Sequence, residues 1–267
     1  MHSARWQPTP LIRATLALHM LALAAVIAEP GQWRWVLGAL LANHALLVLL
    51  GLWPRSHWLG PNWTRLPAAA AARNEIALTI DDGPDPAVTP QVLELLDHYA
   101  ARATFFCIGE KAAHHPDLCR EIVRRGHAVE NHSQHHRHHF SLLGRSGITR
   151  ELQAAQDTLT AITGQRPLFF RAPAGLRNYF LDPVLARLEL RLAGWSARGF
   201  DTRIGDAERV KNRLLNGLRA GAILLLHDGN AARTPGGTPV ILEVLPAVLA
   251  AARAANLRLV TLRHALS

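Results

Sequence analysis

From residue 75 to the end of the chain, short runs rich in β-branched and aromatic residues alternate with longer segments of helical pattern. This alternation predicts parallel strands joined by crossover helices, in either a closed barrel or a doubly wound open sheet. The strand candidates are residues 75–80, 103–108, 128–132, 168–172, 190–196, 222–227 and 257–262, and the helix candidates between them include 90–100, 110–125, 147–163, 205–219 and 239–255.

Polar residues mark the carboxyl ends of these strands. In chain order, the strand ends carry or precede Asp81 and Asp82, His132, Arg171 and Pro173, Asp201, and His227. In parallel α/β architectures this end of the strands forms the functional face. Because five strand ends would converge on one pocket only in a closed or nearly closed ring, we expect a distorted (β/α) barrel of about seven strands.

The stretch TIDDGPD, residues 79–85, has two interpretations. Asp82-Gly83-Pro84 alone is a good turn former. Side chains of successive strand residues point to opposite faces, so Asp81 and Asp82 can share a pocket only where the strand breaks. Gly83-Pro84 supplies such a break.

Residues 132–139, HSQHHRHH, are rich in histidine. His132 and His136 are four apart, which on a helical turn would bring both imidazoles to one side and within reach of one cation. His135 and His139 share that spacing. A solvated polar loop is the alternative interpretation.

Two apolar runs, residues 11–28 and 36–53, have about the ~17–25 residue length of a membrane-spanning helix. Six of the seven tryptophans lie at or near the ends of these runs, as in an interfacial aromatic belt. We therefore expect residues 1–53 to be a membrane anchor with two transmembrane helices, with a buried helical hairpin as the alternative. Residues 54–74, rich in Pro, Gly, Arg and Ala, indicate a juxtamembrane linker, which leaves 75–267 as the catalytic domain.

Arginine placement predicts how this anchor lies in a bacterial-type inner membrane. Arg5 precedes the first run and Arg13 lies near its start, Arg34 alone lies between the runs, and further arginines follow the second. The positive-inside rule then keeps both flanks, and the catalytic domain, in the cytoplasm. A single true span with a cytoplasmic N-terminus would instead place the domain in the periplasm.

The formal net charge of +9 is nearly all arginine and suits an anionic membrane surface or a polyanion, as well as an ordinary solvated surface. Nucleic acid is not an expected partner, because the tryptophans cluster at the apolar runs rather than among basic residues. Cys107 and Cys119 are too few for a disulfide framework.

Four motifs occur in a fixed order along the catalytic domain. They are Thr79-Ile80-Asp81-Asp82-Gly83-Pro84, His132-Ser133-Gln134-His135-His136, Arg171-Ala172-Pro173-Ala174-Gly175 and Leu225-Leu226-His227. They resemble the motifs of the NodB-homology polysaccharide deacetylases, carbohydrate esterase family four, over residues 75 to about 262. The resemblance implies a distorted barrel of seven or eight β/α units. It also implies hydrolytic deacetylation of glycans with one divalent metal ion, usually zinc, with cobalt or nickel as alternatives.

By the same resemblance, Asp82, His132 and His136 would bind the metal. Asp81 would be the general base for a metal-activated water, whose pKa a bound zinc lowers to about 7. Arg171 would hold Asp81 in its ionised form, since a nearby cation favours the carboxylate.

The resemblance makes His227 the general acid that protonates the leaving amine, with Asp201 orienting its ring. Thr202 stands where the family has a tryptophan, which removes an aromatic wall over the sugar, and Arg137 stands where a proline commonly follows the second metal histidine. The residues expected to line the substrate pocket are Leu225, Pro173, Gly175 and Trp195.

The expected function is therefore deacetylation of an N-acetylated amino sugar in a cell-envelope glycan or its lipid-linked precursor. A cytoplasmic domain with a basic membrane-proximal surface favours the lipid-linked precursor. The alternatives are an extracytoplasmic polymer (peptidoglycan, poly-N-acetylglucosamine or a chitin-like chain) and a catalytically silent glycan-binding protein. The expected partners are the glycan and the lipid bilayer, with no obligate protein partner.

Overall fold

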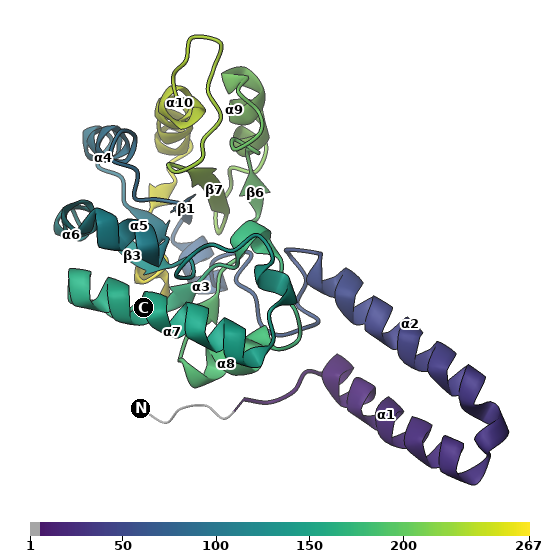
Figure 1. The fold of residues 1–267 in the computed structure, drawn as a ribbon. Helices are drawn as coiled ribbons and strands as arrows, with labels where there is room; N and C mark the ends of the chain where they lie inside the picture. Colours follow the sequence, from purple (N-terminus) through teal and green to yellow (C-terminus); the bar gives the residue numbers. More distant parts are fainter. Residues whose placement is uncertain (1–5) are drawn as a thin grey trace.

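The computed structural model describes residues 6–267. Its first part is an antiparallel hairpin of α1 (Pro10–Ala28) and α2 (Trp33–Gly51), joined by the 3-10 turn η1 (Pro30–Gln32), which projects away from the rest of the molecule (Figure 1). These bounds agree with the two predicted runs. Only Ala22 in α1 and Leu47 and Gly51 in α2 are buried, so the alternative of a buried hairpin is wrong.

The exposed apolar surface of the hairpin needs an apolar environment. By length and hydropathy both helices qualify as candidate membrane spans, a test that a signal sequence also passes. Polar groups link the two helices: Thr15 Oγ1 donates to Asn43 Oδ1 at 3.1 Å, and the His19 and His44 rings lie 5.2 Å apart.

The catalytic domain is built on one curled parallel sheet, as the strand–helix alternation predicts. Its main strands lie in the order β5 (Arg191–Leu192), β4 (Phe169–Phe170), β3 (Ala128–Asn131), β2 (Ala103–Cys107), β1 (Glu75–Asp81), β7 (Ile223–His227) and β6 (Ala197–Arg198). A further short strand, β8 (Arg258–Leu259), pairs with the first residues of β1. The expected α/β barrel of about seven strands is therefore confirmed, in the form of an incomplete ring.

The strand sequences have hydrophobic residues on both faces because both faces of the sheet are covered. Ile76, Leu78 and Ile80 of β1 face outward into a core shared with the surrounding helices, whereas Ala77 belongs to a second core inside the ring. The helices that follow the strands are α4 (Thr89–His98), α5 (Gly109–His114), α6 (Pro116–Arg124), α7 (Arg145–Thr163), α8 (Leu181–Arg187), α9 (Ala207–Leu215) and α10 (Val240–Ala254), most of which surround the sheet in Figure 1.

Three local predictions differ from the structure. The helix expected over 110–125 is two helices, because Pro116 begins α6 and His115 before it leaves the helical conformation. The strand expected over 190–196 ends at Leu192, and β6, which the sequence analysis missed, begins at Ala197. The helix α8 was also not predicted.

Residues 54–74, for which composition predicts a linker, pack against the catalytic domain. The Trp63 N–H donates to Leu192 O at the end of β5, and the Leu66 N–H donates to Gly221 O just before β7, both at 2.9 Å. Leu66 is buried in the inner core, as is Ala70 of the short helix α3 (Ala68–Ala72). The segment therefore connects the β5 edge of the sheet to the residue that precedes β7.

The junction between α2 and the catalytic domain is also tightly packed. The Arg177 N–H donates to Gly51 O at 3.1 Å, and the Arg177 guanidinium donates to Ser56 O at 2.5 Å. Arg177 itself is buried. A Cβ on Gly51 would lie 2.2 Å from Arg177 O, so only glycine fits at this contact.

Candidate active site and metal centre

The strand register brings the predicted site residues to one end of the sheet. Asp81 lies opposite His227 in the β1–β7 ladder, and Asn131 of β3 lies opposite Phe170 of β4. His132 directly follows Asn131, and Arg171 directly follows Phe170. Parallel strands in this register therefore place all four polar side chains at the same carboxyl-terminal edge.

Asp81 and Asp82 share one pocket because the alternation of side-chain direction along the strand is interrupted at Asp82 itself. Asp82 has a φ of 72°, a left-handed conformation that is uncommon for aspartate. The strand break was predicted at Gly83-Pro84, but glycine is required at position 83 for another reason. A Cβ at this position would lie 2.4 Å from Asp228 Oδ1.

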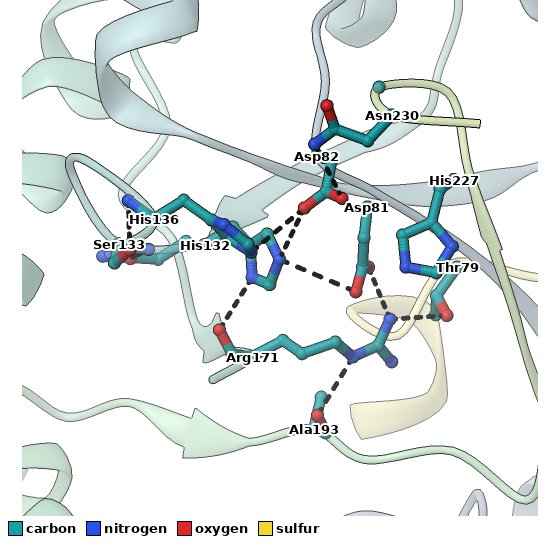
Figure 2. A network of polar contacts seen from close by, with 12 residues as sticks. Thr79, Asp81, Asp82, His132, Ser133, His136, Arg171, Ala193, His227 and Asn230 are labelled. Atoms are coloured by element: carbon teal, nitrogen blue, oxygen red, sulfur yellow. Dashed lines mark hydrogen bonds and ion pairs between the residues drawn. The ribbon is translucent and has the colours of Figure 1, made fainter. Parts of the chain in front are cut away.

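The structure brings Asp82, His132 and His136 together (Figure 2). Asp82 Oδ1 is 3.2 Å from Nε2 of each histidine. Ligands bonded tetrahedrally to zinc at 2.0–2.1 Å are separated from one another by roughly 3.3 Å. Among residues 6–267 this buried oxygen has no hydrogen-bond partner, which is costly for a carboxylate unless a cation meets it. The three residues therefore fit a divalent metal ion.

Each histidine presents the nitrogen that a metal needs. His132 Nδ1 is 2.8 Å from the carbonyl oxygen of Arg171; since a carbonyl can only accept, Nδ1 carries the proton and Nε2 is left free. Burial and the nearby His132 ring lower the pKa of His136 to about 4, so its imidazole is neutral at neutral pH.

The two imidazoles do not converge through a helical turn, as the four-residue spacing suggested. Residues 132–136 are irregular, and both Ser133 and His136 have positive φ. The Ser133 hydroxyl accepts from the His136 N–H at 3.1 Å, which fixes the loop. His135, of the alternative pair, instead contacts Glu151 Oε1 through Nδ1 at 2.9 Å.

Two residues that the sequence analysis missed hold Asp82 in place. Asn230 Nδ2 donates to Asp82 Oδ2 at 3.2 Å, and Lys111 Nζ donates to the backbone oxygen of Asp82 at 2.8 Å. Burial raises the pKa of Asp82, but contact with His132 and the charges of His227 and His136 lower it more, so its net pKa lies below the ordinary value. Lysine is rare in this arginine-rich chain, and this rarity could have drawn attention to Lys111 as a candidate site residue.

Arg171 is fully buried and binds Asp81. Its Nη1 lies 2.7 Å from Asp81 Oδ1 and 2.8 Å from Thr79 Oγ1. The other guanidinium nitrogens donate to the carbonyl oxygens of Ala193 and Gly194, so the group has a partner at each nitrogen. Breaking a buried pair of this kind leaves an uncompensated charge.

His227 pairs with Asp201, which follows β6 rather than the fifth strand as expected. Asp201 Oδ1 is 3.0 Å from His227 Nδ1, and its Oδ2 accepts from the His227 backbone N–H at 2.7 Å. Burial lowers the pKa of His227, but the Asp201 carboxylate and then the Asp81 and Asp82 charges raise it more, so the net pKa lies above the ordinary value. In Figure 2 the His227 ring lies on the side of Asp81 away from His132.

These groups border a cavity of about 530 Å³, a size typical of small-molecule sites. Of the predicted pocket residues, Leu225, Gly175 and Trp195 line it. Pro173 is buried in the 3-10 turn η3 (Pro173–Gly175) and is not part of the lining. Thr202 also lines the cavity, and Trp195 contributes an indole ring to the lining.

A carboxylate, an imidazole that shares a hydrogen bond with a second carboxylate, and a site for a cation can together activate water and protonate a leaving group. They lie at the carboxyl ends of parallel strands, where enzymes of this architecture have their active sites. The site therefore has the groups that a hydrolase needs.

Comparisons with known proteins identify the family. The sequence pattern of the polysaccharide deacetylases matches residues 68–193. A chitooligosaccharide deacetylase of Azorhizobium caulinodans is 37% identical over 167 residues, which are 61% of this chain and 78% of the relative. A peptidoglycan-N-acetylglucosamine deacetylase of Bacillus cereus is 34% identical over 166 residues, 60% and 75% of the two chains. A solved structure of a peptidoglycan N-acetylglucosamine deacetylase aligns with a TM-score of 0.68 at 25% identity, over 76% of this chain and 91% of the other.

The chain therefore belongs to the polysaccharide deacetylase family. It is a hydrolase that cleaves the carbon–nitrogen bond of acetylated amino groups in carbohydrates.

Proposed function

We propose that the chain removes the acetyl group from an N-acetylated amino sugar, with a zinc ion held by Asp82, His132 and His136. The observation that carries the proposal is the buried Asp82 Oδ1, without a hydrogen-bond partner in residues 6–267 and faced by two imidazole nitrogens at 3.2 Å. When bound there, the cation would polarise the acetamide carbonyl and make water more acidic.

In this proposal Asp81 is the general base. Its Oδ1 is bound to Arg171, which leaves Oδ2, 3.8 Å from His132 Nε2, to accept a proton from water beside the metal ligands. The hydroxide oxygen forms a bond to the acetyl carbon. Arg171 orients the carboxylate and disfavours its protonation before the reaction.

His227 is the proposed general acid. The carbon–nitrogen bond breaks as the amine nitrogen takes a proton from Nε2 of His227, giving acetate and a free amine. Asp201 accepts from Nδ1–H, so the Nε2 atom points into the cavity and the imidazolium is stabilised. Leu225 and Trp195 would surround the acetyl methyl group.

The proposed substrate is a lipid-linked precursor of a cell-envelope glycan, handled by a domain that two transmembrane helices anchor. Trp6 Nε1 donates to Asp182 Oδ2 at 2.8 Å, so the start of α1 lies beside the same domain that follows α2, as a two-span hairpin requires. The arginine distribution supports a cytoplasmic domain. Activity of a periplasmic-only reporter fused after Ser267 would contradict that orientation.

A polymeric substrate is the second candidate, because the named relatives act on chitooligosaccharide or on N-acetylglucosamine of peptidoglycan. The test is acetate release by the full chain from N-acetylglucosamine that is lipid-linked, oligomeric or part of peptidoglycan, with and without a chelator. We expect chelator-sensitive release that is fastest with the lipid-linked sugar. No acetate release from any of the three substrates, or release that the chelator does not inhibit, would contradict the proposed function.

Replacing Asp201 by Asn should move the alkaline limb of the kcat/KM profile to lower pH. The acid must be protonated, so activity is lost as the pH rises through the pKa of His227. The Asp201 charge is the main cause that raises this pKa, and without it burial, which lowers the pKa, dominates. The control is Asp157→Asn, an exposed carboxylate on α7. An alkaline limb unchanged in Asp201→Asn would show that His227 is not the acid.

A further inference from the structure

A second cavity, of about 410 Å³, lies between the end of the hairpin and the catalytic cavity. Residues 53–55, directly after α2, form one wall, and Trp195, Ser196, Arg198 and Phe200 form the other. We call these seven residues the Arg198 groove. Trp195 and Arg198 also line the catalytic cavity, so the two cavities meet at these side chains.

Among residues 6–267 no carboxylate forms an ion pair with Arg198. Its guanidinium lies 5.3 Å from the centre of the Trp195 ring and 5.0 Å from that of Phe200. Its Nε is buried and, within residues 6–267, has no hydrogen-bond partner. Stacking on aromatic rings holds the guanidinium plane in place but satisfies none of its five N–H donors.

The surroundings of Arg198 strengthen its positive charge. Arg55 lines the same groove, and the Arg213 guanidinium lies 5.0 Å from the centre of the Phe200 ring. No acidic side chain is among the groove residues. A planar guanidinium that is already oriented and has a second arginine in its groove is suited to a phosphate, which it can bind through two parallel hydrogen bonds.

The order of the hairpin, the Arg198 groove and the catalytic cavity along the molecule indicates which kind of phosphate compound would bind. The hairpin comes first, the Arg198 groove begins two residues after α2 ends at Gly51, and the catalytic cavity follows. A lipid-linked sugar has the same order, with lipid, phosphate and sugar in turn. A neutral sugar of a polymer could stack on Trp195 or Phe200, but it would leave the arginines without a counter-charge.

We propose that the Arg198 groove binds the phosphate or diphosphate group that joins the N-acetylated sugar to a membrane lipid. The inference rests on the proposed deacetylase function and assigns its substrate class. Arg198 is then a specificity-determining residue: it holds the anion while the acetamide lies in the neighbouring catalytic cavity.

The test compares two substrates of the full chain in detergent: N-acetylglucosamine linked to farnesyl diphosphate, and the phosphate-free farnesyl glycoside of the same sugar. Arg198→Gln should lower the ratio of kcat/KM for the diphosphate to that for the glycoside by roughly 10- to 100-fold, mainly through KM, as for loss of charge-assisted hydrogen bonds. Arg253→Gln, at an exposed arginine on α10, should leave the ratio unchanged. An unchanged ratio in Arg198→Gln would overturn the inference.

A binding measurement separates this inference from the proposed function. Calorimetric titration of the wild type and Arg198→Gln with farnesyl diphosphate, farnesol and inorganic pyrophosphate needs no turnover. We expect farnesyl diphosphate to bind best, and binding to weaken in the variant. Equal binding of pyrophosphate would indicate a site for free phosphate and overturn the lipid assignment. Release of acetate only from polymers would overturn the inference and leave the deacetylase function intact.

Discussion

Asp81→Asn is expected to lower kcat for acetate release by about 10²–10⁴-fold, the usual contribution of a general base. The amide oxygen of asparagine can still accept the hydrogen bond that Arg171 Nη1 gives to Asp81 Oδ1 at 2.7 Å, so the fold and the position of the side chain should be retained. What is lost is the ability to take a proton. Single-turnover acetate release is the measurement, with zinc content and thermal unfolding measured beside it.

Asp157→Asn serves again as the control, because it makes the same chemical change at an exposed site on α7. If Asp81→Asn kept wild-type turnover with normal zinc content, the assignment of the base would be wrong. If the variant lost zinc, Asp81 would belong to the metal site rather than to proton transfer.

His136→Ala should remove the metal, and with it nearly all activity. In the proposed site this histidine is one of three protein ligands, and loss of a partner that only orients a ligand already costs about 10- to 100-fold in affinity or activity. His136 is less buried than His132, so the truncated variant should still fold. Zinc bound per chain, measured by mass spectrometry, should fall to background.

His139→Ala is the matched control, since His139 is an exposed histidine of the same loop. A second measurement does not depend on turnover: added zinc should raise the melting temperature of the wild type and of His139→Ala, but not that of His136→Ala, because a ligand stabilises only a fold that binds it. Zinc retained by His136→Ala would contradict the proposed ligand set.

The general architecture can be predicted from the sequence because hydrophobic runs and the polar residues at their ends are both local features of the chain. Hydrophobic runs such as 75–80 and 222–227 correspond to β1 and β7, and polar residues at their ends mark the functional edge of the sheet. Two-residue strands such as β6 carry too few residues for a periodic pattern. The packed segment 54–74 was also missed, since its proline and alanine content hides the few side chains, such as Leu66, that are buried.

The fine geometry of the candidate site could not be read from the sequence. Asp82, Ser133, His136 and Asn230 all have positive φ, although none is glycine. Such conformations cost free energy and persist only where the surrounding structure enforces them, which is common at functional sites. Asp82, His132 and His136 are therefore predictable by resemblance, whereas the four-residue spacing wrongly suggests that a helical turn brings the two histidines together.

The contact between Gly51 and Arg177 has a consequence for how the enzyme selects acetyl groups. A flexible linker would let the distance between the catalytic cavity and the hairpin vary. The hydrogen bonds that Arg177 forms at 3.1 Å and 2.5 Å instead hold the opening of the cavity at one height and one angle relative to the hairpin. If the hairpin lies in a bilayer, as proposed, only acetamides at that height would reach the cavity. For the proposed lipid-linked substrate, the distance between lipid and sugar would then decide whether it reacts.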